Sequence, residues 1–223
     1  SEPQRGIWLS SQLKEEFSCA YNESMYMVFE GGFNIDAMRQ AIEGLVERHD
    51  ALRAIFNSDG TSMYLRPSMS IEIPLINISE HSQDKKVRTF KDLLRKESST
   101  GFDLENGPLF RSKIIRVNKE EYCVTLTSHH IVCDGWALDV LISDLCILYN
   151  AFNNNVSPDM KPVESYGSYI KQLNERRESD DFAESRKFWL NKYSDNKTIL
   201  NLPTDAFRQD DRNIEAIRLD KKI

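Results

Sequence analysis

The junction that decides the fold reads Ser128-His129-His130-Ile131-Val132-Cys133-Asp134-Gly135-Trp136. It joins an apolar run at 122–132, which predicts a strand, to an apolar run at 137–152, which predicts a helix. Side chains alternate between the two faces of a strand, so His129 and His130 must point in opposite directions. One ring can face a cleft while the other is held inside the fold. Asp134 lies beyond the strand, where the backbone can turn it back, and Gly135 permits a tight turn and leaves its N–H open to a substrate.

A doubled histidine followed by Asp-Gly at such a junction favours a functional site. A histidine that is neutral near pH 7 suits general-base catalysis, because its ordinary pKa lies close to the operating pH. The alternative is a structural role, which is the commoner one for an isolated histidine on a strand, and the residues alone leave both interpretations open. A metal site is disfavoured because adjacent strand residues diverge and no third His or Cys has suitable ligand spacing.

Outward from this junction, helices alternate with hairpins and isolated strands. Strands are predicted over 23–29, 51–56, 62–66, 109–117 and 122–132. Helices are predicted over about 35–48 (capped by Asn34 or Asp36), 84–98, 137–152 and 165–193, the last interrupted near 179–181. This order predicts an α/β (α+β) sandwich with a mixed, mainly antiparallel sheet flanked by helices. Residues 202–205 are expected to begin a linker, and 214–223 a further strand.

A second polar cluster, Glu47-Arg48-His49-Asp50-Ala51-Leu52-Arg53, ends the first clear helix. Arg48 and Arg53 are spaced so that each can meet a carboxylate. The alternative is that these cations only complement the helix dipole. Asp134 is a candidate partner in a buried ion pair, with Arg48 the preferred arginine and Arg53 the second choice.

Composition excludes several classes of function. The 223 residues carry a net charge of −6, which disfavours nucleic acid, and the basic residues are scattered. No apolar run is expected to reach the roughly 20 residues of a membrane span, and no signal peptide is recognisable. The four cysteines form no CxxC pair and are expected to be buried free thiols, as suits a reducing cytoplasm. Since no initiator Met is present, we expect the chain to be part of something longer.

Several segments together resemble one family. Residues 129–135 (HHIVCDG) match the HHxxxDG motif of nonribosomal peptide synthetase condensation domains, a motif shared with acyltransferases that resemble chloramphenicol acetyltransferase. Three further segments narrow the resemblance: 1–8 is similar to SxAQxRLW, 48–56 to RHxxLRTxF, and 102–111 to FDLxxGPLxR. Residues 166–172 are a weaker match to YxDYAxW. Gly6, Ser168 and Gln172 depart from the usual Arg, Asp and Trp, which bears on substrate and subtype.

The resemblance implies a fold and a reaction. Condensation domains are V-shaped pairs of chloramphenicol acetyltransferase-like subdomains, and two carrier proteins present thioesters on phosphopantetheine arms from opposite faces of a tunnel. A downstream amine attacks the upstream thioester and forms an amide, in nonribosomal peptide or hybrid polyketide–peptide biosynthesis. By resemblance, His130 is a general base or positions the amine, Gly135 lies beside the reacting centre, and Asp134 is structural, paired with Arg48. His129 and Arg53 are expected to support the site.

The resemblance also implies partners and domain limits. We expect upstream and downstream carrier proteins and neighbouring domains such as an adenylation domain, with no cofactor bound directly and no nucleic acid or membrane. Residues 1–200 are expected to form the N-terminal subdomain and 201–223 the linker and start of the next, so that the chain alone is inactive. Three alternatives remain: a coenzyme A-dependent acyltransferase of the same superfamily, an epimerising relative, and a non-catalytic recruitment module.

Overall fold

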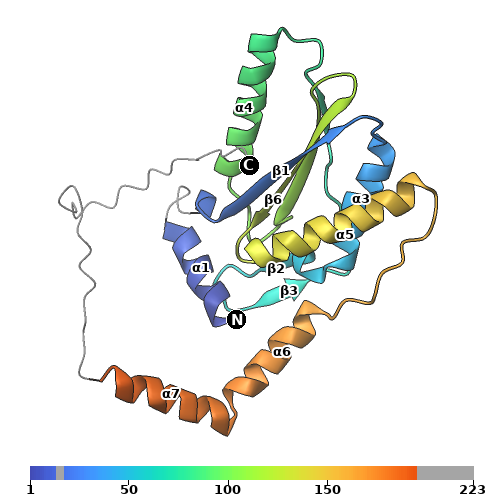
Figure 1. The fold of residues 1–223 in the computed structure, drawn as a ribbon. Coiled ribbons are helices and arrows are strands. Elements are labelled where there is room, and N and C mark those ends of the chain that lie inside the picture. The colour runs from blue at the N-terminus through green and yellow to red at the C-terminus, as the bar shows by residue number, and fades with distance from the viewer. Residues whose placement is uncertain (14–17, 195–223) are drawn as a thin grey trace, which may run out of the picture. The chain divides into compact units, whose positions relative to one another are not determined.

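The computed structural model describes residues 1–13 and 18–194. The chain divides into two compact units, Ser1–Arg176 and Arg177–Ile223. The first unit holds most of the described elements (Figure 1). Their bounds are α1 (Glu2–Leu13), β1 (Asn22–Glu30), α3 (Ile35–Arg48), a 3-10 helix (Asp50–Arg53), β2 (Ala54–Phe56), β3 (Met63–Leu65), β4 (Leu75–Asn77), α4 (Gln83–Ser99), β5 (Phe110–Arg116), β6 (Glu121–His129), α5 (Gly135–Asn153) and α6 (Tyr166–Arg177).

The main sheet has four strands in the order β1-β6-β5-β4. β6 runs antiparallel to both β1 and β5, whereas the short β4 pairs parallel with β5. β2 and β3 form a separate antiparallel ribbon. The predicted mixed, mainly antiparallel sheet is confirmed.

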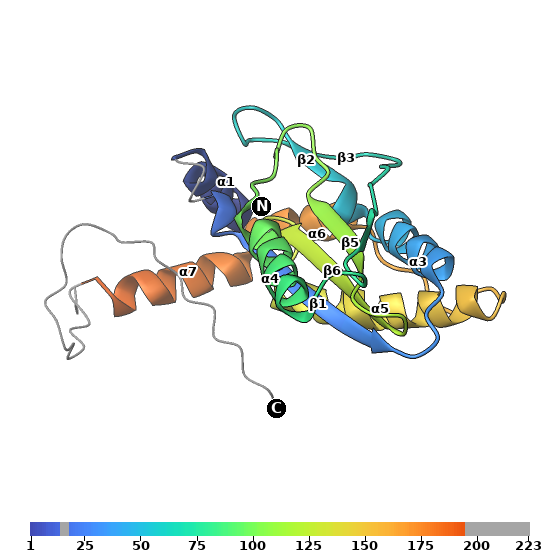
Figure 2. The same ribbon diagram turned by 90° about the horizontal axis from the view of Figure 1, so that it is seen from above.

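Helices cover both faces of this sheet. α3 and α5 lie side by side on one face and α4 lies on the other, as Figure 1 and Figure 2 both show. Successive side chains of β6 point alternately into the two helical layers. Val124 and Leu126 join the core under α3 and α5, whereas Cys123 packs with Phe90 of α4.

α3 follows the predicted helical periodicity. Asn34 caps it, accepting a hydrogen bond from a backbone N–H of the first turn. Met38, Ile42 and Leu45 are fully buried against the sheet. The helix ends at Arg48, as predicted.

Two stretches differ from the prediction. The expected strand over 51–56 is wrong in its first half, where the chain forms the 3-10 helix Asp50–Arg53 before β2. The sequence patterns also do not predict α1. Its buried residues Gln4, Trp8 and Ser11 recur at helical spacing, but two of them are polar, so hydrophobic periodicity does not reveal the helix.

α5 is the most apolar helix of the described part of the chain. By length and composition alone it could cross a membrane, which corrects the expectation that no run reaches that length. However, Leu141, Leu145 and Leu148 are buried in the core that α5 shares with α3. Core helices of globular proteins pass the same test of length and composition.

The second unit contributes one described helix, α7 (Asp180–Lys192). Ser179 caps it, its hydroxyl oxygen accepting a hydrogen bond from the backbone N–H of Phe182 at 3.3 Å. The predicted interruption near 179–181 is confirmed. The predicted linker at 202–205, the strand at 214–223 and the boundary at residue 200 lie outside the described residues.

Candidate active site

His129 and His130 lie where β6 ends and a turn leads into α5. His129 is fully buried, whereas the side chain of His130 is 35% exposed. The predicted divergence of the two rings is confirmed.

His129 is a neutral ring held inside the fold. Its Nδ1 accepts a hydrogen bond from the backbone N–H of Ile131 at 3.2 Å, which places its proton on Nε2. Burial and, less strongly, the neighbouring His130 lower the pKa of His129 to about 4. Phe102 meets the ring edge-on, with centroids 6.1 Å apart. A histidine so enclosed can shape the turn but cannot reach a substrate.

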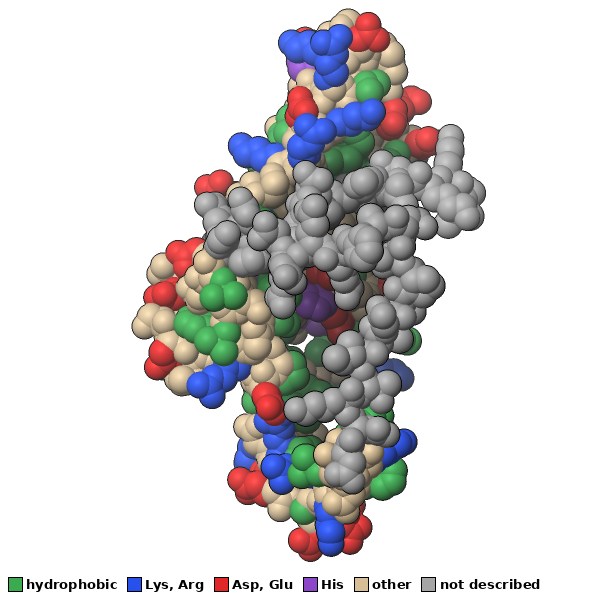
Figure 3. All heavy atoms as spheres, turned by 90° about the vertical axis from the view of Figure 1, so that its left-hand side faces the viewer, with side chains coloured by type: hydrophobic (Ala, Val, Ile, Leu, Met, Phe, Trp, Pro, Cys, Tyr) green, Lys and Arg blue, Asp and Glu red, His purple; other side chains and the backbone are tan. Residues whose placement is uncertain are grey.

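His130 has a carboxylate beside one ring nitrogen. Its Nδ1 lies 3.0 Å from Oε1 of Glu23, although the N–H direction falls short of a well-aligned hydrogen bond. Nδ1 is shielded from solvent and has no hydrogen-bond partner among the described residues. Tyr21 stacks on the ring with centroids 6.4 Å apart, and its carbonyl accepts the His130 backbone N–H at 2.8 Å. Figure 3 shows a histidine side chain beside an acidic one near the middle of the face in view.

Strand register brings Glu23 to His130. In the β1–β6 ladder Glu23 pairs with Ser128, two residues before His130. Alternation therefore places all three side chains on one face of the sheet. Met25 and Met27 continue that face into the core under α3 and α5. Sequence reasoning missed Glu23, although a carboxylate heading a strand whose next inward positions are methionines is a usable signal.

Asp134 does not pair with an arginine. Its side chain is exposed and caps α5, accepting a hydrogen bond from the backbone N–H of Ala137 at 2.8 Å. The predicted buried ion pair with Arg48, or with Arg53, is therefore wrong. A carboxylate at the cap position of a helix is directed to the free N–H groups of that helix.

Arg48 binds a different carboxylate of α5. Its Nε and the Nε2 of His49 both lie 2.8 Å from Oδ2 of Asp144. Arg48 also donates to the carbonyl of Lys161 at 2.8 Å. All three side chains of this cluster are mostly buried, so the cluster fastens α3 to α5.

The other charged residues of the 48–53 segment connect further elements of the fold. Asp50 accepts a hydrogen bond from the backbone N–H of Tyr166 at 3.0 Å, at the start of α6. The guanidinium of Arg53 donates to the carbonyl of Arg66 at 2.9 Å and also to carbonyls at the end of α3. Arg48, Asp50 and Arg53 therefore each connect this segment to another part of the fold.

Gly135 begins α5 and is exposed. Its φ is not positive and an added Cβ would meet nothing within 4 Å, so neither the backbone conformation nor the space beside it requires glycine here. Its backbone N–H lies in the first turn of α5, where such groups lack helical partners.

α1 supports the turn that carries His130. Nε2 of Gln4 donates to the carbonyl of Ile131 at 2.8 Å in a buried contact, and Trp8 belongs to the same hydrophobic cluster as Ile131. Trp8 also lies where a Cβ on Gly60 would be, at 2.3 Å, and Gly60 has φ +67°. Sequence reasoning did not assign this role to Gln4.

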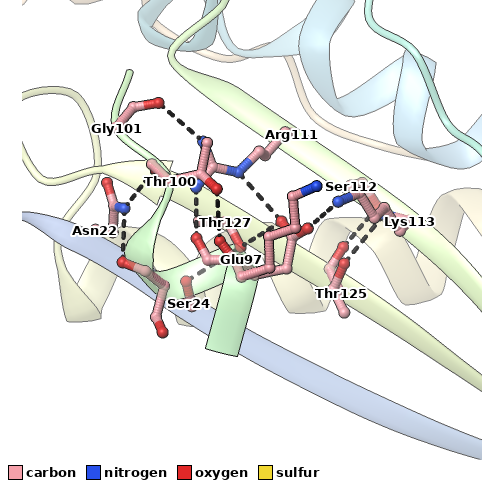
Figure 4. A network of polar contacts seen from close by, with 12 residues as sticks. Asn22, Ser24, Glu97, Thr100, Gly101, Arg111, Ser112, Lys113, Thr125 and Thr127 are labelled. Carbon is pink, nitrogen blue, oxygen red and sulfur yellow. Dashed lines mark hydrogen bonds and ion pairs between the residues drawn. The ribbon is translucent and has the colours of Figure 1, made fainter. Parts of the chain in front are cut away.

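A second carboxylate lies on the α4 side of the sheet. Glu97 is only 3% exposed; one oxygen lies 3.1 Å from Nε of Arg111 and the other contacts Nζ of Lys113 (Figure 4). The hydroxyl of Thr127 is 3.4 Å from the first oxygen. Arg111 also covers the ring of Phe102 at 4.0 Å. Both oxygens of Glu97 are thus occupied by cations.

The cysteines offer no reactive thiol beside His130. All four are free, and burial raises the pKa of Cys123 to about 12 and of Cys133 to about 11. Cys146 is exposed and Cys19 partly so, which corrects the expectation of buried thiols there. Cys133 lines a small apolar pocket of about 180 Å³ that His130 does not line. Within residues 1–13 and 18–194, no group of three or more His, Cys, Asp or Glu side chains is placed to hold a metal ion.

Comparison with known proteins assigns the family. The family model described as Condensation domain matches residues 1–223, so the chain belongs to the condensation domain family, whose members are acyltransferase-type enzymes.

Relatives and solved structures agree with this assignment. The chain is 27% identical over 226 residues to chondramide synthase cmdD of Chondromyces crocatus, covering 100% of the chain and 6% of that protein. It is 29% identical over 212 residues to malpibaldin synthetase of Mortierella alpina, covering 92% of the chain and 4% of the synthetase. The chain therefore spans only a small part of these large proteins.

The fold is that of the starter condensation domain of rhizomide synthetase RzmA, with a TM-score of 0.79 at 22% identity, over 87% of this chain and 47% of that one. SgcC5 of Streptomyces globisporus gives 0.70 at 24% identity, over 86% and 47%. The chain thus spans about half the length of these solved structures.

Proposed function

We propose that this chain carries the working histidine of an amide-forming reaction between two carrier-bound thioesters, in nonribosomal peptide or hybrid polyketide–peptide biosynthesis. The amine of the downstream substrate attacks the upstream thioester carbonyl, a C–N bond forms, and the C–S bond breaks. The observation that carries the proposal is the contrast between the two motif histidines in a chain that matches the family over all its residues. His129 is enclosed and neutral, whereas His130 is partly open to solvent.

The residues then divide by role. His130 either takes a proton from the attacking amine or positions it; the first role suits a histidine near neutral pH. Gly135 is proposed to lie beside the reacting thioester, because the space beside its Cα is open. His129 supports the site from within the fold and Asp134 by capping α5 at the exposed start of that helix. Arg48 and Arg53 support it less directly, by joining neighbouring elements.

The partners proposed are an upstream and a downstream carrier protein and neighbouring synthetase domains such as an adenylation domain. The substrates would arrive on phosphopantetheine arms, and no residue is assigned to a directly bound cofactor. Free thiols throughout the described cysteines are compatible with a cytoplasmic setting.

The test is reconstitution. The full protein that carries this chain is incubated with two carrier proteins, one bearing an acyl or peptidyl thioester and the other an aminoacyl thioester, and the carriers are analysed by mass spectrometry. The expected result is an amide product on the downstream carrier, and none when either carrier is left unloaded. Product formed instead from acyl-coenzyme A and a free amine, with no transfer between carriers, would favour the coenzyme A-dependent alternative.

A further inference from the structure

We propose that Glu23 is a positioning residue for His130. Its carboxylate holds the ring proton on Nδ1 and leaves Nε2 free to take a proton from the attacking amine. This inference rests on the proposed function, since it assigns Glu23 a role within amide formation.

The geometry of the ring selects Glu23 for this role. Nδ1 of His130 is shielded from solvent and lies 3.0 Å from Oε1 of Glu23, with no other partner among the described residues. The side chain is nonetheless 35% exposed, so its open surface lies away from Nδ1, and Nε2 is not among the buried atoms that lack a partner. A neutral imidazole carries one proton, and a carboxylate at one nitrogen fixes it there.

Glu23 is also free of competing ties. In the described part of the chain it makes no other ion pair, whereas the exposed Glu30 lies at the far end of the same strand. The contact with His130 is not yet well aligned, as is common for catalytic hydrogen bonds before substrate binds. A half-exposed carboxylate can turn to complete the contact when substrate displaces water.

The proton balance is simple. As the amine attacks, its proton passes to Nε2, and the ring becomes a cation that Glu23 stabilises through Nδ1–H. The proton then passes to the sulfur of the departing phosphopantetheine thiolate, so the ring returns to its neutral form. Orientation of a histidine by a carboxylate at its second nitrogen is a general device of acid–base catalysis.

The experiment is a double-mutant cycle in the full protein, measured as carrier-to-carrier amide formation. Glu23→Gln is expected to lower kcat by about tenfold to hundredfold, with KM for the carriers little changed and the melting temperature preserved. Glu30→Gln, the matched control, should leave kcat and melting temperature unchanged. In a His130→Ala background, Glu23→Gln should cause no further loss, because residues that act as one unit are not additive.

The outcomes separate the two proposals. Wild-type kcat in Glu23→Gln, or the same fold-loss in the His130→Ala background as in wild type, would overturn the role of Glu23 and leave the proposed function standing. If Glu23→Gln fails to fold, Glu23→Asp replaces it, with partial activity expected because the carboxylate is kept but its reach is shorter. Absence of amide formation by the wild-type protein would instead contradict the proposed function.

Discussion

Glu97 and Glu23 lie on opposite faces of the same sheet and differ in almost every physical respect. Glu97 is 3% exposed and has a cation at each oxygen. Glu23 is 38% exposed and faces one histidine in an incompletely aligned contact. A polar cluster such as that of Glu97, in which every hydrogen-bonding group has a partner, rigidifies a fold. A pair such as Glu23 and His130, which still has unused hydrogen-bonding groups, can interact with a substrate. The sheet therefore separates a carboxylate with a structural role on the α4 side from the one proposed to position His130 on the α5 side.

The largest effect on stability is expected at the structural carboxylate. Glu97→Ala leaves Arg111 and Lys113 together without their counter-charge, which should cost about 3–5 kcal/mol of the free energy of unfolding. The loss would appear as a lower melting temperature and denaturant midpoint, while the rate per folded molecule is kept. Glu105→Ala, at an exposed carboxylate, is the control and should be near neutral. Equal stability of the two variants would contradict the structural role of Glu97.

A smaller loss is expected at the joint between α3 and α5. Asp144→Ala removes the acceptor that Arg48 and His49 share, which should cost about 1.5–3 kcal/mol. Asp139→Ala, at an exposed position of the same helix, should change stability little. Denaturant unfolding of both variants checks this, and a wild-type midpoint for Asp144→Ala would show that the cluster does not fasten the helices.

His129 should make stability depend on pH. Burial lowers its pKa to about 4, below the ordinary value near 6.5, so between these values the unfolded chain binds more protons than the folded one. Its contribution to stability is present above about pH 6.5 and is lost as pH falls toward 4, at up to about 1.4 kcal/mol per pH unit. His129→Asn keeps an acceptor for the Ile131 N–H and should flatten that dependence. If the free energy of unfolding fell with pH equally in wild type and in His129→Asn, His129 would not be a buried neutral ring.

The smallest effect is expected at Asp134. Because its side chain caps α5, Asp134→Ala should cost about 1 kcal/mol, and Asp134→Asn almost nothing, since asparagine caps equally well. Thermal melting of the two variants measures the difference. A loss of several kcal/mol in Asp134→Asn would instead fit a buried ion pair.

How far the sequence predicts this molecule depends on the range of the interaction. Local patterns predict α3 with its Asn34 cap and the divergence of His129 and His130, because periodicity and alternation fix them. Partners far apart in sequence are not predicted. Asp134 and Asp144 both belong to the α5 segment, and only the packed helix decides which of them meets Arg48.

The same limit applies to the site itself. Glu23 reaches His130 through the β1–β6 register, and Gln4 reaches the turn from a helix whose buried face is largely polar. Glu23 heads a strand whose next inward positions are methionines, but that local pattern does not identify His130 as its partner, and Gln4 has no local signature. Both arise only when distant segments of the chain are brought together.

The most direct test of the account is the rate of amide formation by His130→Ala in the full protein, measured alongside its melting temperature. If His130 takes a proton from the amine or positions it, the loss should be about 10²-fold or more, the scale of acid–base assistance. The melting temperature should not change, because the His130 side chain is partly exposed and lies outside the hydrophobic core. Wild-type turnover by that variant would contradict this role of His130.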